Sequence, residues 1–171
     1  MAHYREATRQ DVAELSEKMR KADAEEVMAS SGLTPIQALT KGFELSKGLS
    51  IIHKDELIGM FGVAEVGEDI GSPWMLGSDK IPEIKKDLLT QALDWVIRTN
   101  KEYPLLVNYV DVRNKVAIRW LKFLGFLFKE QEVLVKGVKM LYFYKEPCYK
   151  VQKGLEPILK HLGPRYRTTQ L

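Results

Sequence analysis

The stretch VNYVDVRNKVAIRWLKFLGFLF, from Val107 to Phe128, decides the fold of this chain. It begins with an apolar run typical of a buried strand and continues, after Asn114, with apolar residues at helical spacing. Asn114 is a suitable helix N-cap residue, and Gly125 is a typical helix stop. The stretch therefore predicts a strand followed by a short amphipathic helix.

The segments before this unit alternate between helices and strands. HYREA predicts a short strand, and Thr8 and Asp11 have the spacing of a capping box that opens the helix TRQDVAELSEKMRKA. A Thr-Pro pair at 34–35 opens a second helix that runs towards Gly48. LSIIHKDELIGMFGVAEV predicts a hairpin, SPWMLGSD a brief strand and IPEIKKDLLTQALDWVIRTN a long helix.

The segments after Gly125 predict a final hairpin, FLFKEQEVLVKGVKMLYFYKE, that turns near Gly137. The complete order is β-α-α-β-β-β-α-β-α-β-β, which implies a mixed α/β sheet with antiparallel hairpins at each end and a parallel pair in the middle. Residues 1–146 are expected to form one domain. Residues 147–171 form a basic C-terminal extension, in which a short helix over Leu155 to Leu162 is expected.

Composition excludes several classes of site. The single cysteine, Cys148, allows neither an intramolecular disulfide nor a cysteine cluster, and the three histidines lack ligand spacing, so no metal is expected. No apolar run approaches the ~20 residues of a membrane helix. The N-terminus also lacks the apolar region of a signal peptide, so a cytoplasmic protein is expected. The net charge of +3 favours anionic partners only weakly.

The order of elements and the run N-x-x-A-I-x-x-L-x-x-x-G-F resemble the GNAT superfamily of acyl-CoA N-acyltransferases. The matching residues are Asn114, Ala117, Ile118, Leu121, Gly125 and Phe126. The resemblance implies two central strands that splay apart, so that pantetheine pairs with their free backbone groups. It also implies a glycine-rich loop before the long helix, where backbone N–H groups hold the pyrophosphate.

The resemblance implies a set of site residues for an active enzyme. The candidates for binding acetyl-CoA are Met75, Leu76, Gly77, Lys80, Lys85, Asn108 and Asn114. Glu65 and Asp111 are candidate general bases for an amine. Tyr109 is a candidate acid, because Leu121 stands where many family members carry a tyrosine.

Some of these residues also have a purely structural interpretation. Asn114 could border a cofactor or cap a helix, and the cap is favoured. Trp74 could gate a pocket or anchor the core. Gly77 could mark the splay of the central strands or a turn, and the lysines at 80, 85 and 86 could hold phosphate or form a solvated helix face.

The stretch GSDKIPEIKKDLL departs from the GNAT pattern at the phosphate loop. It lacks the loop glycines, Pro82 removes one N–H donor, and Asp79 and Glu83 add negative charge where pyrophosphate would lie. Lysine side chains could contribute charge there, but they do not replace a backbone cradle. This departure predicts weakened cofactor binding.

A narrower resemblance is to the internal virion protein A family of short-tailed bacteriophages. The matching positions are Trp74, Leu76, Gly77, Asp79, Tyr103, Pro104, Asn108, Tyr109, Val110, Asn114, Ile118, Trp120, Leu121, Gly125 and Phe126. This resemblance implies a virion or assembly protein on a degenerate GNAT fold, structural or accessory, with no cofactor. It would be made in the host cytoplasm and carried in the virion.

The virion interpretation implies portal, core or tail proteins of the phage as partners. A homo-oligomer and nucleic-acid contact through the basic tail are further possibilities, and no membrane span is expected. The alternative interpretation is an acetyl-CoA-dependent N-acetyltransferase that acts on an amine by direct transfer. Retention of CoA through purification would favour this alternative.

Overall fold

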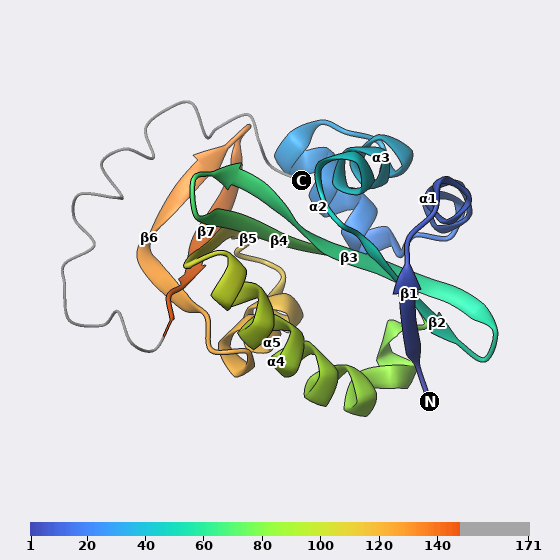
Figure 1. The fold of residues 1–171 in the computed structure, drawn as a ribbon. Coiled ribbons are helices and arrows are strands. Elements are labelled where there is room, and N and C mark those ends of the chain that lie inside the picture. Colours follow the sequence, from blue (N-terminus) through green and yellow to red (C-terminus); the bar gives the residue numbers. More distant parts are fainter. Residues whose placement is uncertain (148–171) are drawn as a thin grey trace.

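The computed structural model describes residues 1–147, which form one mixed seven-stranded sheet with helices on both faces (Figure 1). The strand order is β1-β2-β3-β4-β5-β7-β6. The strands are β1 (His3–Glu6), β2 (Leu49–His53), β3 (Glu56–Gly67), β4 (Ile70–Gly77), β5 (Leu105–Asp111), β6 (Leu127–Val135) and β7 (Val138–Lys145). The helices are α1 (Arg9–Glu17), α2 (Lys21–Ser31), α3 (Pro35–Leu45), the 3₁₀ helix η1 (Ile81–Ile84), α4 (Lys85–Glu102) and α5 (Lys115–Phe123).

The predicted fold class is confirmed, with one helix more than the sequence indicated. The parallel pair is β4 with β5, and the other pairs are antiparallel, as expected for hairpins at each end of the sheet. The helix expected over Leu155 to Leu162 lies outside the described residues. No helix within residues 1–147 is long and apolar enough to cross a membrane.

The additional helix is α2, and its inward face explains why the sequence pattern did not predict it. The buried residues of α2 are Asp23, Val27 and Ser30, so two of the three are polar and no apolar stripe marks the helix. Its first residue follows Arg20, whose side chain makes no capping hydrogen bond. Only its end has a strong signal, because Gly32 takes the left-handed conformation with φ of 74°.

The helices cover opposite faces of the sheet, with α1, α2 and α3 on one face and α4 and α5 on the other (Figure 1). On the first face, Leu15 of α1 and Leu39 of α3 pack against the sheet. On the opposite face, the start of α4 packs on β2 and β3 through Leu88, while Val96 packs on β5 and α5. Helix α4 therefore spans both halves of the sheet.

Trp74 of β4 is a core anchor, which confirms the structural interpretation of this residue. It is 7% exposed, and its indole N–H donates to the hydroxyl of Ser46 at 3.1 Å. The ring packs against Gly42 of α3, where a side chain of any size would collide with it. The close approach of α3 to the sheet therefore depends on the glycine at position 42.

Replacing Gly42 with Ala is expected to lower the free energy of unfolding by about 1–3 kcal/mol. The added Cβ would lie 2.8 Å from Cζ2 of Trp74, so the ring or the helix must move. This cost opposes a gain in helix propensity of about 1 kcal/mol. Gly48→Ala is the control, because its Cβ would meet nothing closer than 3.6 Å. Equal stability of the two variants in denaturant titrations would contradict the prediction.

Candidate functional site

β4 and β5 pair in parallel over two residues and then separate. Ile70 lies opposite Leu105, and Gly71 lies opposite Leu106. Beyond these pairs, β4 stays paired with β3 and β5 stays paired with β7. The sheet therefore opens into a wedge between β4 and β5, as the resemblance to GNAT enzymes implied.

The alternation of antiparallel pairs decides which backbone groups of β4 face this wedge. Ser78 donates its N–H to the carbonyl of Ile58, a residue of β3, so the backbone groups of Ser78 point towards β3. The residues one, three and five positions earlier therefore direct their backbone groups away from β3 and towards β5. These residues are Gly77, Met75 and Pro73.

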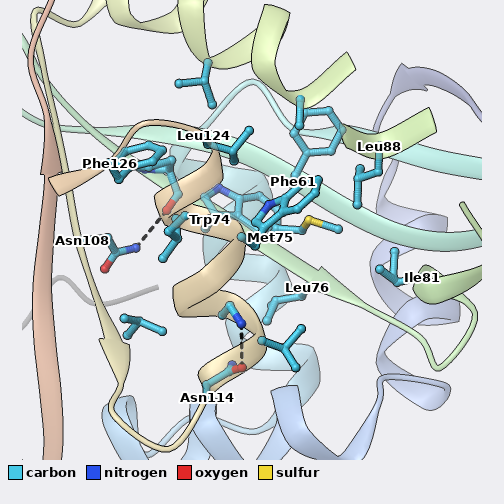
Figure 2. Close-up of a pocket in the computed structure, with 18 of the residues that line it drawn as sticks. Phe61, Trp74, Met75, Leu76, Ile81, Leu88, Asn108, Asn114, Leu124 and Phe126 are labelled. Atoms are coloured by element: carbon cyan, nitrogen blue, oxygen red, sulfur yellow. Dashed lines mark hydrogen bonds between the residues drawn. The ribbon is translucent and has the colours of Figure 1, made fainter. Parts of the chain in front are cut away.

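Asn108 of β5 closes the narrow end of the wedge. Its Nδ2 donates to the carbonyl of Pro73 across the gap at 3.0 Å (Figure 2). Its Oδ1 accepts from the N–H of Tyr109 at 2.7 Å. The carboxamide thus takes the place of one rung of the parallel ladder, immediately beyond the last paired residues.

Two carboxylates of α2 close the wide end of the wedge. Gly77 donates its N–H to Oδ2 of Asp23 at 2.9 Å, and Asp111 donates its N–H to Oε1 of Glu26 at 3.2 Å. The N–H of Arg20 donates to the carbonyl of Gly77 at 2.8 Å. Helix α2 therefore bridges the separated ends of β4 and β5. Met75, between the two closed ends, directs its N–H and C=O into the wedge.

A cavity of about 870 Å³ occupies the wedge and extends between α4 and α5. Its lining is largely apolar, and Figure 2 shows several of these side chains converging on it from both sides. The aromatic and aliphatic lining includes Met75, Leu88, Trp95, Trp120, Leu124 and Phe126. Helix α2 supplies a polar wall, with Asp23 and Glu26 among its residues.

Burial raises the pKa of both α2 carboxyls. For Asp23, burial outweighs the guanidinium of Arg20, whose Nη2 lies 2.7 Å from Oδ1 and lowers the pKa. For Glu26, burial outweighs the hydrogen bonds donated by Asn114 Nδ2, at 2.6 Å, and by the N–H of Asp111. A carboxylate with a raised pKa beside a cavity is a better proton acceptor than an ordinary surface carboxylate.

Asn114 caps α5, which confirms the structural interpretation of this residue. Its Oδ1 accepts from the N–H of Ala117 at 3.1 Å (Figure 2). The same side chain has a second role that the sequence did not indicate, because its Nδ2 holds the carboxylate of Glu26. The cap therefore also fixes the position of a cavity-lining acid.

The predicted cofactor-binding residues divide into two groups. Met75, Leu76, Lys85, Asn108 and Asn114 line the cavity. Gly77 and Lys80 do not belong to this lining. Gly77 is buried at the end of β4, where its N–H donates to Asp23 and its carbonyl accepts from the N–H of Arg20. Lys80 is exposed and forms an ion pair with Glu56 of β3.

Tyr109 alone among the three predicted proton-transfer residues lines the cavity. Its ring meets Tyr142 edge to face, with centroids 5.2 Å apart. Glu65 is exposed on β3 opposite Gly71, at the end of the sheet where β4 and β5 are still paired. The carboxylate of Asp111 is held by Arg113, whose guanidinium lowers its pKa.

Asp23 and Glu26 are the site residues that sequence reasoning missed. Both lie on the helix that was not predicted. Their only sequence signal is the series 23, 26, 27 and 30, which has the spacing of one helix face and carries two acids. Glu26 and Tyr109 both line the cavity, whereas Glu65 and Asp111 do not.

Whether CoA fits this site depends on the segment between β4 and α4, where its diphosphate would lie. Residues 81–84 form η1, in which Pro82 carries no N–H, and the buried side chain of Ile81 fills the space in front of Gly77. The wedge fits a pantetheine arm, but this segment does not fit a diphosphate. Within residues 1–147, no group of three or more His, Cys, Asp or Glu side chains could hold a metal ion.

No protein-family profile and no curated protein sequence matches the chain. Solved structures of GNAT acetyltransferases share its fold. A GNAT-family acetyltransferase from Streptococcus pneumoniae superposes with a TM-score of 0.60 at 19% identity, covering 85% of this chain and 99% of that one. Spermidine N-acetyltransferase from Vibrio cholerae, in complex with CoA and spermine, gives 0.61 at 14% identity, with 85% and 95% covered.

A third structure, an aminoglycoside acetyltransferase in complex with coenzyme A, gives a TM-score of 0.60 at 18% identity, covering 85% of this chain and 95% of that one. At these identities the likeness shows the fold, and the chain has the GNAT fold. Nothing in these comparisons supports the narrower resemblance to phage internal virion proteins.

Proposed function

From the GNAT fold of this chain we propose that it is an N-acyltransferase, which moves an acyl group from a pantetheine thioester such as acetyl-CoA to an amine. The observation that carries the proposal is the wedge between β4 and β5, open at Met75 and continuous with a cavity that Glu26 and Tyr109 line. The complexes of two structural neighbours with CoA support a donor of this class.

The wedge supplies the contacts that a pantetheine arm needs. The arm is a chain of amides, and the N–H and C=O of Met75 would pair with them as a strand partner does. The apolar walls at Trp95, Trp120 and Leu124 exclude water, which protects a thioester from hydrolysis. When bound, the donor supplies the activated acyl group.

Two protons must move during the transfer. The amine loses a proton as the C–N bond forms, and the sulfur gains a proton as the C–S bond breaks. We assign the first proton to the carboxylate of Glu26, which Asn114 and the backbone of Asp111 hold in place. The phenol of Tyr109, the one tyrosine of β5, donates the second proton to the sulfur.

The α2 wall also favours a cationic acceptor. Asp23 lies one helical turn before Glu26 and lines the same cavity, but Arg20 pairs with it, so the uncompensated charge of this wall is that of Glu26. An amine approaches as an ammonium ion, which a carboxylate stabilises. The ion gives one proton to solvent to become the nucleophile, and Glu26 takes the next proton as the C–N bond forms. The acceptor is therefore an amine that enters from the α2 side of the wedge.

The test is an assay of thiol release from acetyl-CoA in the presence of single amines: a polyamine, an aminoglycoside, lysine and a peptide with a free N-terminus. Protein-dependent release that requires the amine, with the acetylated amine found by mass spectrometry, is expected. Absence of release with every amine, together with no binding of the donor at 1 mM, would refute the proposal.

A second candidate is a noncatalytic role, for which we keep the phage virion protein as the example, and one observation favours the loss of catalysis. The side chains of α2 occupy the backbone N–H groups of Gly77 and Asp111 at the wide end of the wedge, as they would in a site that no longer receives a ligand. In that case the partners would be portal, core or tail proteins and the final location the virion. This candidate predicts neither donor binding nor thiol release.

A further inference from the structure

The segment between β4 and α4 has no place for the nucleotide end of CoA. We propose that the acyl donor is recognised through its pantetheine arm alone, so that the diphosphate and the adenosine 3′-phosphate of CoA add no affinity. The donor class is then any acyl-pantetheine thioester, with or without the nucleotide. This inference rests on the proposed function and names its donor.

Five of the seven backbone N–H groups from Ser78 to Lys85 already have an acceptor. The N–H of Ser78 donates to Ile58 at 2.8 Å, that of Ile81 to Ser78 at 3.2 Å, and that of Glu83 to Lys80 at 3.0 Å. The N–H of Lys80 donates to the Ser78 hydroxyl at 3.4 Å, and the Lys85 N–H to the Pro82 carbonyl. A phosphate cradle needs several free N–H groups that point to one spot.

The side chains of the segment also leave no room for a phosphate. Ile81 is 8% exposed and covers both Gly59 and Gly77, so an apolar group occupies the space where a backbone could approach a phosphate. Pro82 has no N–H to offer. The tight 3₁₀ turn of η1 is thus a core element that closes the sheet, and a nucleotide would have to displace it.

The charges around the segment also oppose an anion. Lys80 forms an ion pair with Glu56, and Lys54 pairs with Glu83 at 3.2 Å, so both lysines already neutralise carboxylates. Asp79 is exposed in the same segment and adds negative charge. Lys85 lines the cavity and exposed Lys86 follows it, but exposed lysines contribute little at physiological salt.

The pantetheine part of the site is intact by contrast. Met75 offers its backbone groups, Asn108 fixes the width of the wedge, and the cavity beyond them is apolar. The favourable contacts for a donor therefore lie along the arm and the acyl group. The affinity of CoA and the affinity of pantetheine should then be alike.

Calorimetric titration of the full chain with CoA, pantetheine and adenosine 3′,5′-bisphosphate tests this inference. We expect dissociation constants for CoA and pantetheine within about threefold of each other, unchanged between low and high salt, and no binding of the bisphosphate. CoA binding at least tenfold tighter than pantetheine, a difference of about 1.4 kcal/mol, would overturn the inference. Failure of both thiols to bind would overturn the proposed function itself.

Two variants locate the binding. Lys85→Ala removes the cavity-lining lysine at the start of α4 and should leave both affinities unchanged; a tenfold loss for CoA alone would show that the nucleotide is bound there. Ala92→Phe places a ring in the cavity from α4 and should weaken both thiols at least tenfold. Undiminished binding to a folded Ala92→Phe variant would place the arm elsewhere and overturn the inference.

Discussion

Replacing Glu26 with Gln is expected to lower kcat/KM for acyl transfer by about 10²–10⁴-fold, the usual contribution of a general base. Gln keeps the shape of the side chain and can still accept the N–H of Asp111, but it cannot take the proton of the amine. The measurement is the rate of thiol release at matched amine concentration. Glu25→Gln is the control, because Glu25 is an exposed neighbour on α2 and should leave the rate unchanged.

The pH profile separates this role from a structural one. Burial raises the pKa of Glu26, so the rate of the wild-type protein should increase with pH through an inflection above the usual range of a glutamate, about 4.3. Glu26→Asp should restore part of the activity with a similar profile. An E26Q variant that keeps the wild-type rate within threefold, with the same inflection, would exclude Glu26 as the base.

Replacing Asp11 with Ala is expected to lower the free energy of unfolding by about 2–4 kcal/mol, because the N–H of Thr8 and the hydroxyl of Ser50 both lose a charged acceptor. Asp11 is 3% exposed, and its carboxylate joins three elements of the fold. It accepts two bonds from Arg5 of β1, at 2.6 and 2.7 Å. It also accepts the N–H of Thr8 at 2.8 Å and the hydroxyl of Ser50 of β2 at 2.9 Å.

Denaturant unfolding at pH 7 measures the effect, and Glu17→Ala on the exposed side of α1 is the control, with an expected change within about 0.5 kcal/mol. The effect also depends on pH. Burial alone would raise the pKa of Asp11, but Arg5 and the hydrogen bonds from Thr8 and Ser50 hold it well below its usual range.

The folded-state pKa of Asp11 therefore lies below the unfolded value of about 3.9, so Asp11 contributes its stability above that pH and loses it as the pH falls further. The difference in unfolding free energy between wild type and D11A should be constant from pH 7 to pH 5 and smaller at pH 3. An identical difference at pH 7 and pH 3 would contradict this account.

The fold could be predicted from the sequence because its boundaries are marked by local interactions. The capping box of Thr8 and Asp11 forms as expected, and the helix opened by the Thr-Pro pair starts with a box in which Gln37 accepts the N–H of Thr34 at 2.9 Å. The cap of Asn114 and the left-handed Gly125 likewise depend on neighbours within a few residues. Such signals survive in a single sequence because no distant contact is needed to read them.

The candidate site was only half predictable for the same reason. Met75, Asn108 and Tyr109 could be named because the resemblance to GNAT enzymes implies a wedge between two central strands, and all three line the cavity. Glu26 does not, because its partners Asp111 and Asn114 are 85 and 88 residues away and no apolar stripe marks its helix. Glu65 lies near the end of β3, but it pairs with Gly71, at the end of the sheet where β4 and β5 are still paired.

Within residues 1–147, two residue pairs of β4 and β5 and the carboxamide of Asn108 join the half-sheet β1 to β4 to the half-sheet β5 to β7. On the α2 face, the wide end of the gap is closed by side chains rather than by a ladder. Exchange of the Gly77 and Asp111 amide hydrogens with solvent is therefore expected to need only the loss of their bonds to Asp23 and Glu26, without unfolding of either half-sheet. Exchange at these two amides, compared with that at Val110 in the β5–β7 ladder, gives the free energy of that local opening directly.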